Sequence, residues 1–155
     1  MLEIKEAITK EEIKITKDLI LEYANELDLD LSFQNFRDEV NTLPKKYAPP
    51  DGVILLAFWE GEPAGCIALR KLEDEICEMK RLYVKPSFRR YGIGKKLSLA
   101  LLDKAKKLGY SKMRLDTLRS MIKPVKLYES LGFYEIEAYY NNPIQNVVYF
   151  EIELN

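Results

Sequence analysis

The 155-residue chain contains no histidine and only two cysteines, which removes side chains on which many catalytic and metal sites depend. Without histidine, a general acid or base must be a carboxylate, a tyrosine, a lysine or a thiol. Cys66 and Cys77 fall on expected strands and have no metal-ligating company in the sequence. We therefore expect two buried free thiols, no metal site and no disulfide.

Long apolar runs, low-complexity segments and internal repeats are also missing. The longest apolar run, Val53–Trp59, is far too short to cross a bilayer. Charges at Glu3, Lys5 and Glu6 interrupt the N-terminus, so no signal-peptide pattern is visible. With 47% apolar and 32% charged residues, the chain fits a single globular domain over residues 1–155, with the cytoplasm as the default compartment and no membrane partner.

The net charge of −1 conceals an uneven distribution of charge along the chain. Residues 79–112 hold eleven Lys or Arg and one acid, whereas residues 1–50 hold seven bases and eleven acids. A basic segment suits phosphate binding and an acidic one could attract a cationic amine, although charged runs on helices are commonly solvated faces. A pI of about 5.7, without aromatics interleaved along a continuous basic face, argues against a nucleic-acid partner.

The most informative motif is a glycine loop made of Arg89, Arg90, Tyr91, Gly92, Ile93, Gly94 and Lys95. A strand-forming run, Glu75–Val84, precedes it, and apolar residues at helical spacing follow it. The glycines let the backbone approach a ligand, and free amides in the first turn of a helix attract phosphate. Arg89 and Arg90 add charge-assisted hydrogen bonds to the same anion. The loop predicts a pyrophosphate cradle for a coenzyme A derivative, although Gly-x-Gly alone also occurs in tight turns at helix starts.

Other glycine motifs fit this loop poorly. A P-loop has Lys and then Ser or Thr after its last glycine, but Gly94 is followed by Lys95 and Lys96, with no hydroxyl for magnesium. A dinucleotide-binding fingerprint would need a small residue where Leu97 stands, and a place near the start of a βαβ unit.

Two separate blocks together resemble the GNAT superfamily of acetyl-CoA-dependent N-acetyltransferases. Arg89, Gly92 and Gly94 fill its Arg/Gln-x-x-Gly-x-Gly/Ala signature, and Leu127–Phe133 is similar to its Leu-Tyr-x-x-x-Gly-Phe block. The specific match covers roughly residues 76–135. The resemblance implies an α/β (α+β) fold with a mixed, mostly antiparallel central sheet flanked by helices, and acetyl-CoA as the cosubstrate.

The expected elements follow the order of that family. We predict strands at residues 2–7, 53–59, 64–71, 75–84, 113–117, 133–138 and 147–154. We predict helices at 10–27, at 32–43 with Ser32 as its cap, from the glycine loop to near Gly109, and from about 121 to 130 with Pro124 in its first turn. The strand Val147–Leu154 could lie at a sheet edge and pair with a second subunit, which leaves a homodimer open.

The resemblance implies catalytic roles for Tyr128 and Glu78. Tyr128 matches the family's usual general acid, which protonates the coenzyme thiolate, and Glu78 has the spacing from Arg89 of the glutamate that is the general base in some members. A carboxylate with a pKa of ~4 is a poor direct base for an amine near ~10, so burial or an intervening water would have to help. Aromatic packing for Tyr128 and a cross-strand pair with a lysine for Glu78 are the structural alternatives.

The resemblance also implies that the backbone of Leu82, Tyr83 and Val84 binds the thioester and pantetheine, where a bulge near Val84 frees donors. Where the family often has an Asn that holds the coenzyme, this chain has Met121, so that contact is expected to differ.

The acceptor site is the least specified part of the sequence. Four residues before Pro143 could line a pocket for a small polar amine or simply form a loop between the last two strands: Tyr139, Tyr140, Asn141 and Asn142.

These observations predict an N-acetyltransferase that moves the acetyl group of acetyl-CoA to a primary amine of a small molecule or peptide. Transfer is expected to be direct, in a ternary complex, because neither cysteine has a visible activating partner for a covalent route. The alternative from another class is a non-catalytic acyl-CoA-binding regulatory module. O-acetyl transfer and transfer of longer acyl groups are also compatible with the motif.

Overall fold

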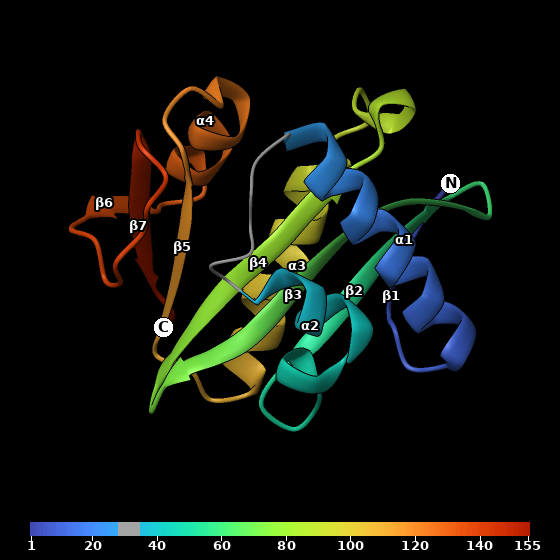
Figure 1. Ribbon diagram of the computed structural model, residues 1–155, viewed down its shortest axis with the longest axis horizontal. Helices are drawn as coiled ribbons and strands as arrows, with labels where there is room; N and C mark the ends of the chain where they lie inside the picture. The colour runs from blue at the N-terminus through green and yellow to red at the C-terminus, as the bar shows by residue number, and fades with distance from the viewer. Residues whose placement is uncertain (28–34) are drawn as a thin grey trace.

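The computed structural model describes residues 1–27 and 35–155, which build one mixed sheet with helices on both faces (Figure 1). The strand order is β1-β2-β3-β4-β5-β7-β6, and only the β4–β5 pair is parallel. The strands are β1 (Leu2–Glu6), β2 (Val53–Trp59), β3 (Glu62–Glu73), β4 (Ile76–Val84), β5 (Lys112–Leu118), β6 (Tyr134–Ile136) and β7 (Val147–Glu153). The predicted α/β class and mixed sheet are confirmed.

The helices divide between the two faces of the sheet (Figure 1). They are α1 (Lys10–Leu27), α2 (Phe36–Asn41), α3 (Ile93–Lys107) and α4 (Ile122–Ser130), with 3-10 turns η2 (Lys45–Tyr47) and η3 (Pro86–Phe88). Leu97 and Leu101 of α3 are buried in the larger core, which Tyr128 of α4 also enters. Leu19 and Ile20 of α1 are buried in a second core on the other face.

Successive side chains along a strand point to opposite faces of the sheet, so neighbouring residues of one strand enter different cores. Leu55 of β2 belongs to the core beneath α3, whereas Leu56 belongs to the core beneath α1. Cys77 and Cys66 fall on opposite sides in the same way. Burial raises the pKa of each thiol to about 12, so both cysteines are the inert buried thiols that the sequence predicts.

The parallel pair β4–β5 separates soon after it forms. Its register contains Ile76↔Lys112, Cys77↔Met113 and Glu78↔Arg114, although β4 continues to Val84 and β5 to Leu118 (Figure 1). Beyond Glu78, the backbone N–H and C=O groups on the β5 side of β4 therefore have no ladder partner on β5. A gap lined by backbone groups opens inside the sheet.

A β-bulge lies in β4 just after this separation begins. The register with β3 passes from Ala68↔Lys80 to Cys66↔Tyr83. Two residues of β4, Arg81 and Leu82, therefore oppose one residue of β3, Ile67. Arg81 has φ of 60°, in the left-handed region that residues with a side chain rarely adopt. The bulge predicted near Val84 is present, centred on Arg81 and Leu82.

A buried carboxylate on α2 holds the Arg81 side chain. Arg81 donates from Nε to Oε2 and from Nη2 to Oε1 of Glu39, both at 2.9 Å, and the side chains are 4% and 2% exposed. Glu39 also accepts a hydrogen bond from the Tyr47 hydroxyl at 2.9 Å and pairs with Lys46 at 2.8 Å. Burial alone would raise the pKa of Glu39, but Arg81 and Lys46 lower it to about 2.

Two predicted features need correction. The second helix is shorter than residues 32–43, because α2 spans only Phe36–Asn41, and its predicted cap, Ser32, lies outside the described residues. The final strand does not lie at a sheet edge: β7 is flanked by β5 and β6, so its backbone is already paired on both sides. The expectation that this strand lies at an edge, where it could pair with a second subunit, is therefore wrong.

The longest described helix, α1, carries charges along its length, and no helix within residues 1–27 and 35–155 is both long and apolar enough to span a bilayer.

The Glu39 carboxylate should make folding sensitive to acid. Its pKa is 4.5 when unfolded and about 2 when folded, so the folded state binds fewer protons between these values. Its contribution to stability is complete above the unfolded value and is lost as pH falls from 4.5 towards 2, an effect of about 3 kcal/mol. Urea unfolding over this range should show a shallower pH dependence in Glu39→Gln than in the wild type. Equal slopes would contradict the assignment.

Candidate active site

A cavity of about 450 Å³ opens where β4 and β5 part. Residues 79–84 form one wall and residues 115–118 the other, and the glycine loop, the start of α4 and the end of α1 complete it. The volume is typical of a site for a small molecule or for one arm of a larger one. The gap in the sheet is therefore a ligand-sized pocket with backbone groups in its walls.

Most of the predicted coenzyme residues meet at this cavity. Those in its walls are Leu82, Tyr83, Val84, Arg89, Gly92, Ile93, Gly94 and Lys95. Arg90 is exposed and Tyr91 stacks on Trp59, with ring centroids 4.4 Å apart, and neither contributes to the cavity wall.

The glycine loop shapes the cavity at the start of α3. Gly92 caps the helix with φ of 70°, which glycine adopts without steric cost. A Cβ at Gly94 would lie 3.9 Å from both Leu127 Cδ2 and Val84 Cγ2, so a methyl group would fit the protein but would stand in the cavity wall. Bare backbone at this position, beside the N-terminus of α3, fits a phosphate group.

Arg89 is held by the end of α1. Its Nε donates to the Val84 carbonyl at 2.8 Å, its Nη2 donates to Glu26 at 2.6 Å, and its guanidinium lies over the Tyr83 ring. Glu26 shares the cavity wall with Arg89. A phosphate bound here would compete with Glu26 for this guanidinium.

Tyr128 stands in the cavity wall on α4 and is only 7% exposed. Its ring packs edge-on against Phe133, with centroids 5.8 Å apart, and its hydroxyl has no hydrogen-bond partner within residues 1–27 and 35–155. Burial raises the pKa of the phenol well above its usual value, so the group stays protonated at neutral pH. The aromatic packing that was the alternative for Tyr128 is present, and the residue that it holds in the cavity wall is an undissociated phenol.

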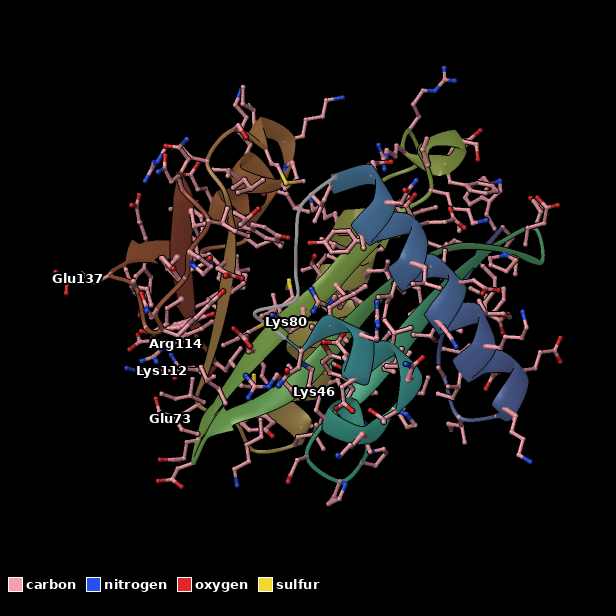
Figure 2. All side chains as sticks on the ribbon, in the orientation of Figure 1. Lys46, Glu73, Lys80, Lys112, Arg114 and Glu137 are labelled. Carbon is pink, nitrogen blue, oxygen red and sulfur yellow. The ribbon has the colours of Figure 1, made fainter. Side chains whose placement is uncertain are left out.

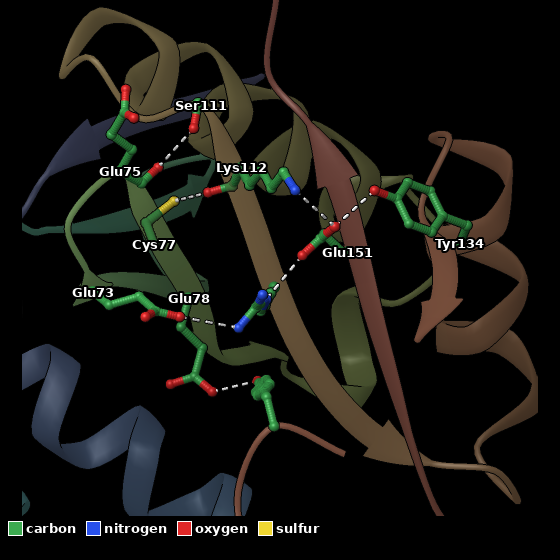
Figure 3. A network of polar contacts seen from close by, with 10 residues as sticks. Glu73, Glu75, Cys77, Glu78, Ser111, Lys112, Tyr134 and Glu151 are labelled. Carbon is green, nitrogen blue, oxygen red and sulfur yellow. Dashed lines mark hydrogen bonds and ion pairs between the residues drawn. The ribbon is translucent and has the colours of Figure 1, made fainter. Parts of the chain in front are cut away.

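Glu78 is buried beside the cavity and is not part of its wall. One carboxylate oxygen accepts a hydrogen bond from Arg70 at 2.8 Å. The other accepts one from the Tyr139 hydroxyl at 2.5 Å, which is the contact drawn at Glu78 in Figure 3. The cross-strand partner of Glu78 is thus an arginine and not a lysine, and its second oxygen is held by a tyrosine hydroxyl.

Asp116 is the carboxylate that does line the cavity. It accepts hydrogen bonds from the Tyr140 hydroxyl and from Asn142 Nδ2, the latter at 3.3 Å. The predicted acceptor residues Tyr139 and Tyr140 lie behind the wall, each bound through its hydroxyl to a carboxylate, while Asn142 reaches the cavity itself. The loop after β6 is therefore docked on the sheet at the site.

Lys80 adds a cation to the same region. It lines the cavity from β4 and lies on the face of the sheet that also carries Arg114 and Lys112 (Figure 2). Burial lowers the pKa of Lys80, while the charges of Glu78 and Asp116 act in the opposite direction. The cavity thus contains both signs of charge at its inner end.

Several wall residues escaped the sequence reasoning. They are Tyr23, Glu26, Lys80, Asp116, Thr117, Met121, Leu127 and Ile144, among others. Met121, noted only as a departure from the family pattern, is in the wall, with Thr117 Oγ1 3.9 Å from its sulfur. Asp116 could have been noticed in the sequence as an acidic residue within a strand expected to be buried, at residues 113–117.

The site combines bare backbone at the N-terminus of α3 with a cavity between two parted strands. Residues 15–133 match the profile of the acetyltransferase (GNAT) family, and the chain belongs to that family.

The chain is 45% identical over 141 residues to an uncharacterised N-acetyltransferase of Schizosaccharomyces pombe, covering 90% of this chain and 86% of that one. Its fold is similar to that of a GNAT-family acetyltransferase from Staphylococcus aureus, with a TM-score of 0.82, 21% identity and complete coverage of both chains. A Bacillus subtilis acetyltransferase in complex with CoA is 26% identical and also fully covered, with a TM-score of 0.71. The protein is an acyl-CoA-dependent acetyltransferase, and a non-catalytic binding module is not favoured.

A methyl group at Gly94 should separate coenzyme binding from folding. Gly94→Ala should raise the Kd for coenzyme A about 10-fold, because the methyl group stands where the phosphates approach the backbone. Stability should be unchanged or up to about 1 kcal/mol higher, since alanine favours a helix more than glycine does. Titration calorimetry and urea unfolding measure the two quantities.

Leu99→Ala, on an exposed position of the same helix, is the matched control and should leave the Kd unchanged. An unaltered Kd in Gly94→Ala would mean that the phosphates do not approach this turn.

Proposed function

We propose that this enzyme transfers the acetyl group of acetyl-CoA to a primary amine of a small molecule or peptide, by direct transfer in a ternary complex. The observation that carries the proposal is one cavity that brings together three features: the buried Tyr128, the part of β4 that is no longer paired with β5, and the carboxylate of Asp116. Direct transfer is supported because burial raises the pKa of both thiols to about 12 and neither cysteine lines the cavity.

The backbone of Leu82, Tyr83 and Val84 is proposed to bind the thioester arm. These residues lie in the cavity wall beyond the last β4–β5 register pair, so an N–H group that points to the β5 side, such as that of Val84, can donate to a carbonyl group of the ligand. A hydrogen bond to the thioester carbonyl would stabilise the negative charge that develops on its oxygen as the amine attacks.

Tyr128 is proposed as the general acid. As the carbon–sulfur bond breaks, the Tyr128 hydroxyl gives its proton to the departing thiolate. The attacking amine loses one proton as the carbon–nitrogen bond forms, and return of one proton to the Tyr128 phenolate completes the cycle. The raised pKa of the phenol is compatible with this role, because desolvation in the same cavity also raises the pKa of the leaving thiol.

The proton acceptor for the amine is proposed to be a carboxylate beside the inner end of the cavity. Glu78, the predicted base, is held by Arg70 and Tyr139, so it would act through a water or through the Tyr139 hydroxyl. Asp116 lies in the wall itself and can contact the ammonium group directly. We therefore assign the direct contact to Asp116 and a supporting role to Glu78 and to the two tyrosines, Tyr139 and Tyr140.

The experiment that tests the function measures thiol release from acetyl-CoA with a panel of amino acids, polyamines, aminoglycosides and short peptides. Turnover with an amine, and mass-spectrometric detection of its N-acetyl product, would support the proposal. Turnover only with alcohols, or only with longer acyl-CoA thioesters, would replace it with O-acetyl or longer-acyl transfer.

Removing the hydroxyl of Tyr128 should affect chemistry and not binding. Tyr128→Phe should lower kcat about 100-fold, the usual size of a general-acid contribution, and leave the Kd for coenzyme A within about 3-fold of the wild type. Steady-state kinetics and calorimetry provide the comparison. A kcat equal to that of the wild type would remove Tyr128 from the mechanism.

The two carboxylates should differ in their effects. Asp116→Asn should lower kcat more than Glu78→Gln, because only Asp116 reaches the acceptor directly, and we expect about 100-fold against about 10-fold. Both substitutions keep hydrogen-bonding capacity towards the partner tyrosines. The opposite order at saturating acceptor would restore Glu78 as the base.

A further inference from the structure

The bulge in β4 combines two features that separately cost free energy. Arg81 takes a left-handed backbone conformation that residues with a Cβ rarely adopt, and its guanidinium is removed from water. Such features persist where the surrounding structure fixes them. Here the fixing group is Glu39, which accepts two parallel hydrogen bonds from Arg81 at 2.9 Å.

The Glu39–Arg81 ion pair is a clamp that joins α2 to the cavity wall proposed to bind the thioester, the acyl site. Glu39 and Phe36 both lie on α2, with the Phe36 ring 5.2 Å from the Arg81 guanidinium carbon. Arg81 and the residues immediately after it, Leu82–Val84, are part of the cavity wall. The Arg81 carbonyl accepts a contact from Cys66 Sγ at 3.4 Å on the β3 side. The direction of the chain through Leu82–Val84 is therefore set at Arg81.

We propose that Glu39 and Arg81 are positioning residues for acetyl transfer: their buried ion pair holds the β4 bulge so that the backbone of Leu82–Val84 is aimed at the thioester carbonyl. Neither side chain needs to touch the substrate. Loosening the pair would let the bulge relax towards a regular strand and turn these amides away from the carbonyl. The coenzyme phosphates, bound at the separate glycine loop, would still be held.

The chain contains a matched control for this clamp. Glu151 on β7 is a buried carboxylate that receives one arginine, one lysine and one tyrosine hydroxyl, as Glu39 does (Figure 3). Its partners are Arg114 at 2.8 Å, Lys112 at 3.7 Å and the Tyr134 hydroxyl at 2.7 Å. None of the four residues of this network lies in the cavity wall, although Arg114 packs on the ring of Tyr139 at 5.3 Å. Loss of the Glu151 carboxylate should therefore disturb folding and leave the backbone of Leu82–Val84 in place.

The test reads the thioester carbonyl directly, with acetyl-CoA labelled with ¹³C at that carbon. Isotope-edited infrared spectra of the bound thioester should show its carbonyl band at lower frequency than in free acetyl-CoA, because a hydrogen bond polarises the bond. In Glu39→Gln the band should return at least half of the way to its free position, while the Kd for acetyl-CoA stays within about 3-fold. Glu151→Gln should keep the wild-type band.

Arg81→Lys keeps the charge but not the two-pronged geometry, and it should give an intermediate band. This variant also decides the matter if Glu39→Gln does not fold. A wild-type band in Glu39→Gln or in Arg81→Lys, or an equal shift in Glu151→Gln, would overturn the proposal. A carbonyl band at the same frequency in free acetyl-CoA and in acetyl-CoA bound to the wild type would also overturn the proposal. Because no acceptor amine is used, failure here is distinct from failure of the proposed amine acetylation.

Discussion

The separation of two parallel strands is the constraint on which the rest of this site depends. β4 and β5 share three register pairs and then diverge, so a sheet that would otherwise be closed contains a cavity with unpaired backbone groups. Buried backbone groups without partners are costly, and a ligand that supplies amide and carbonyl groups would satisfy them. The same divergence leaves Tyr128 on α4 and Asp116 on β5 lining one space.

Charge pairing between segments that are distant in sequence stabilises this arrangement. Acids in the N-terminal third meet bases of the segment after the middle of β4: Glu22 pairs with Lys85 at 3.3 Å, Glu26 with Arg89 at 2.6 Å, and Glu39 with Arg81. The uneven charge that suggested attraction of a cationic acceptor is thus largely explained by complementarity within the fold. The exposed pairs contribute little to stability individually, whereas the buried Glu39–Arg81 pair is costly to break.

The sequence predicted the features that short-range patterns encode. Apolar alternation and turn residues located the strands, and the glycine loop with its helix located the cradle, because each depends on neighbouring residues. Asp116 and Glu26 were missed since only the folded chain brings β5 and the end of α1 around one cavity.

Two further features depend on the folded chain. Arginine has no preference for the left-handed region, so Arg81 gave no local sign of the bulge, which was expected near Val84 only from the resemblance to the family. The hairpin formed by β6 and β7 placed β7 inside the sheet, because strand order is settled by pairing between segments and not by composition.

The most direct test of this account is a crystal structure of the protein with acetyl-CoA, examined for the position of the thioester. The account predicts the acetyl carbonyl within hydrogen-bond distance of a backbone amide of Leu82–Val84, the sulfur beside the Tyr128 hydroxyl, and the phosphates at the start of α3. A pantetheine arm that lies outside the gap between β4 and β5 would contradict it.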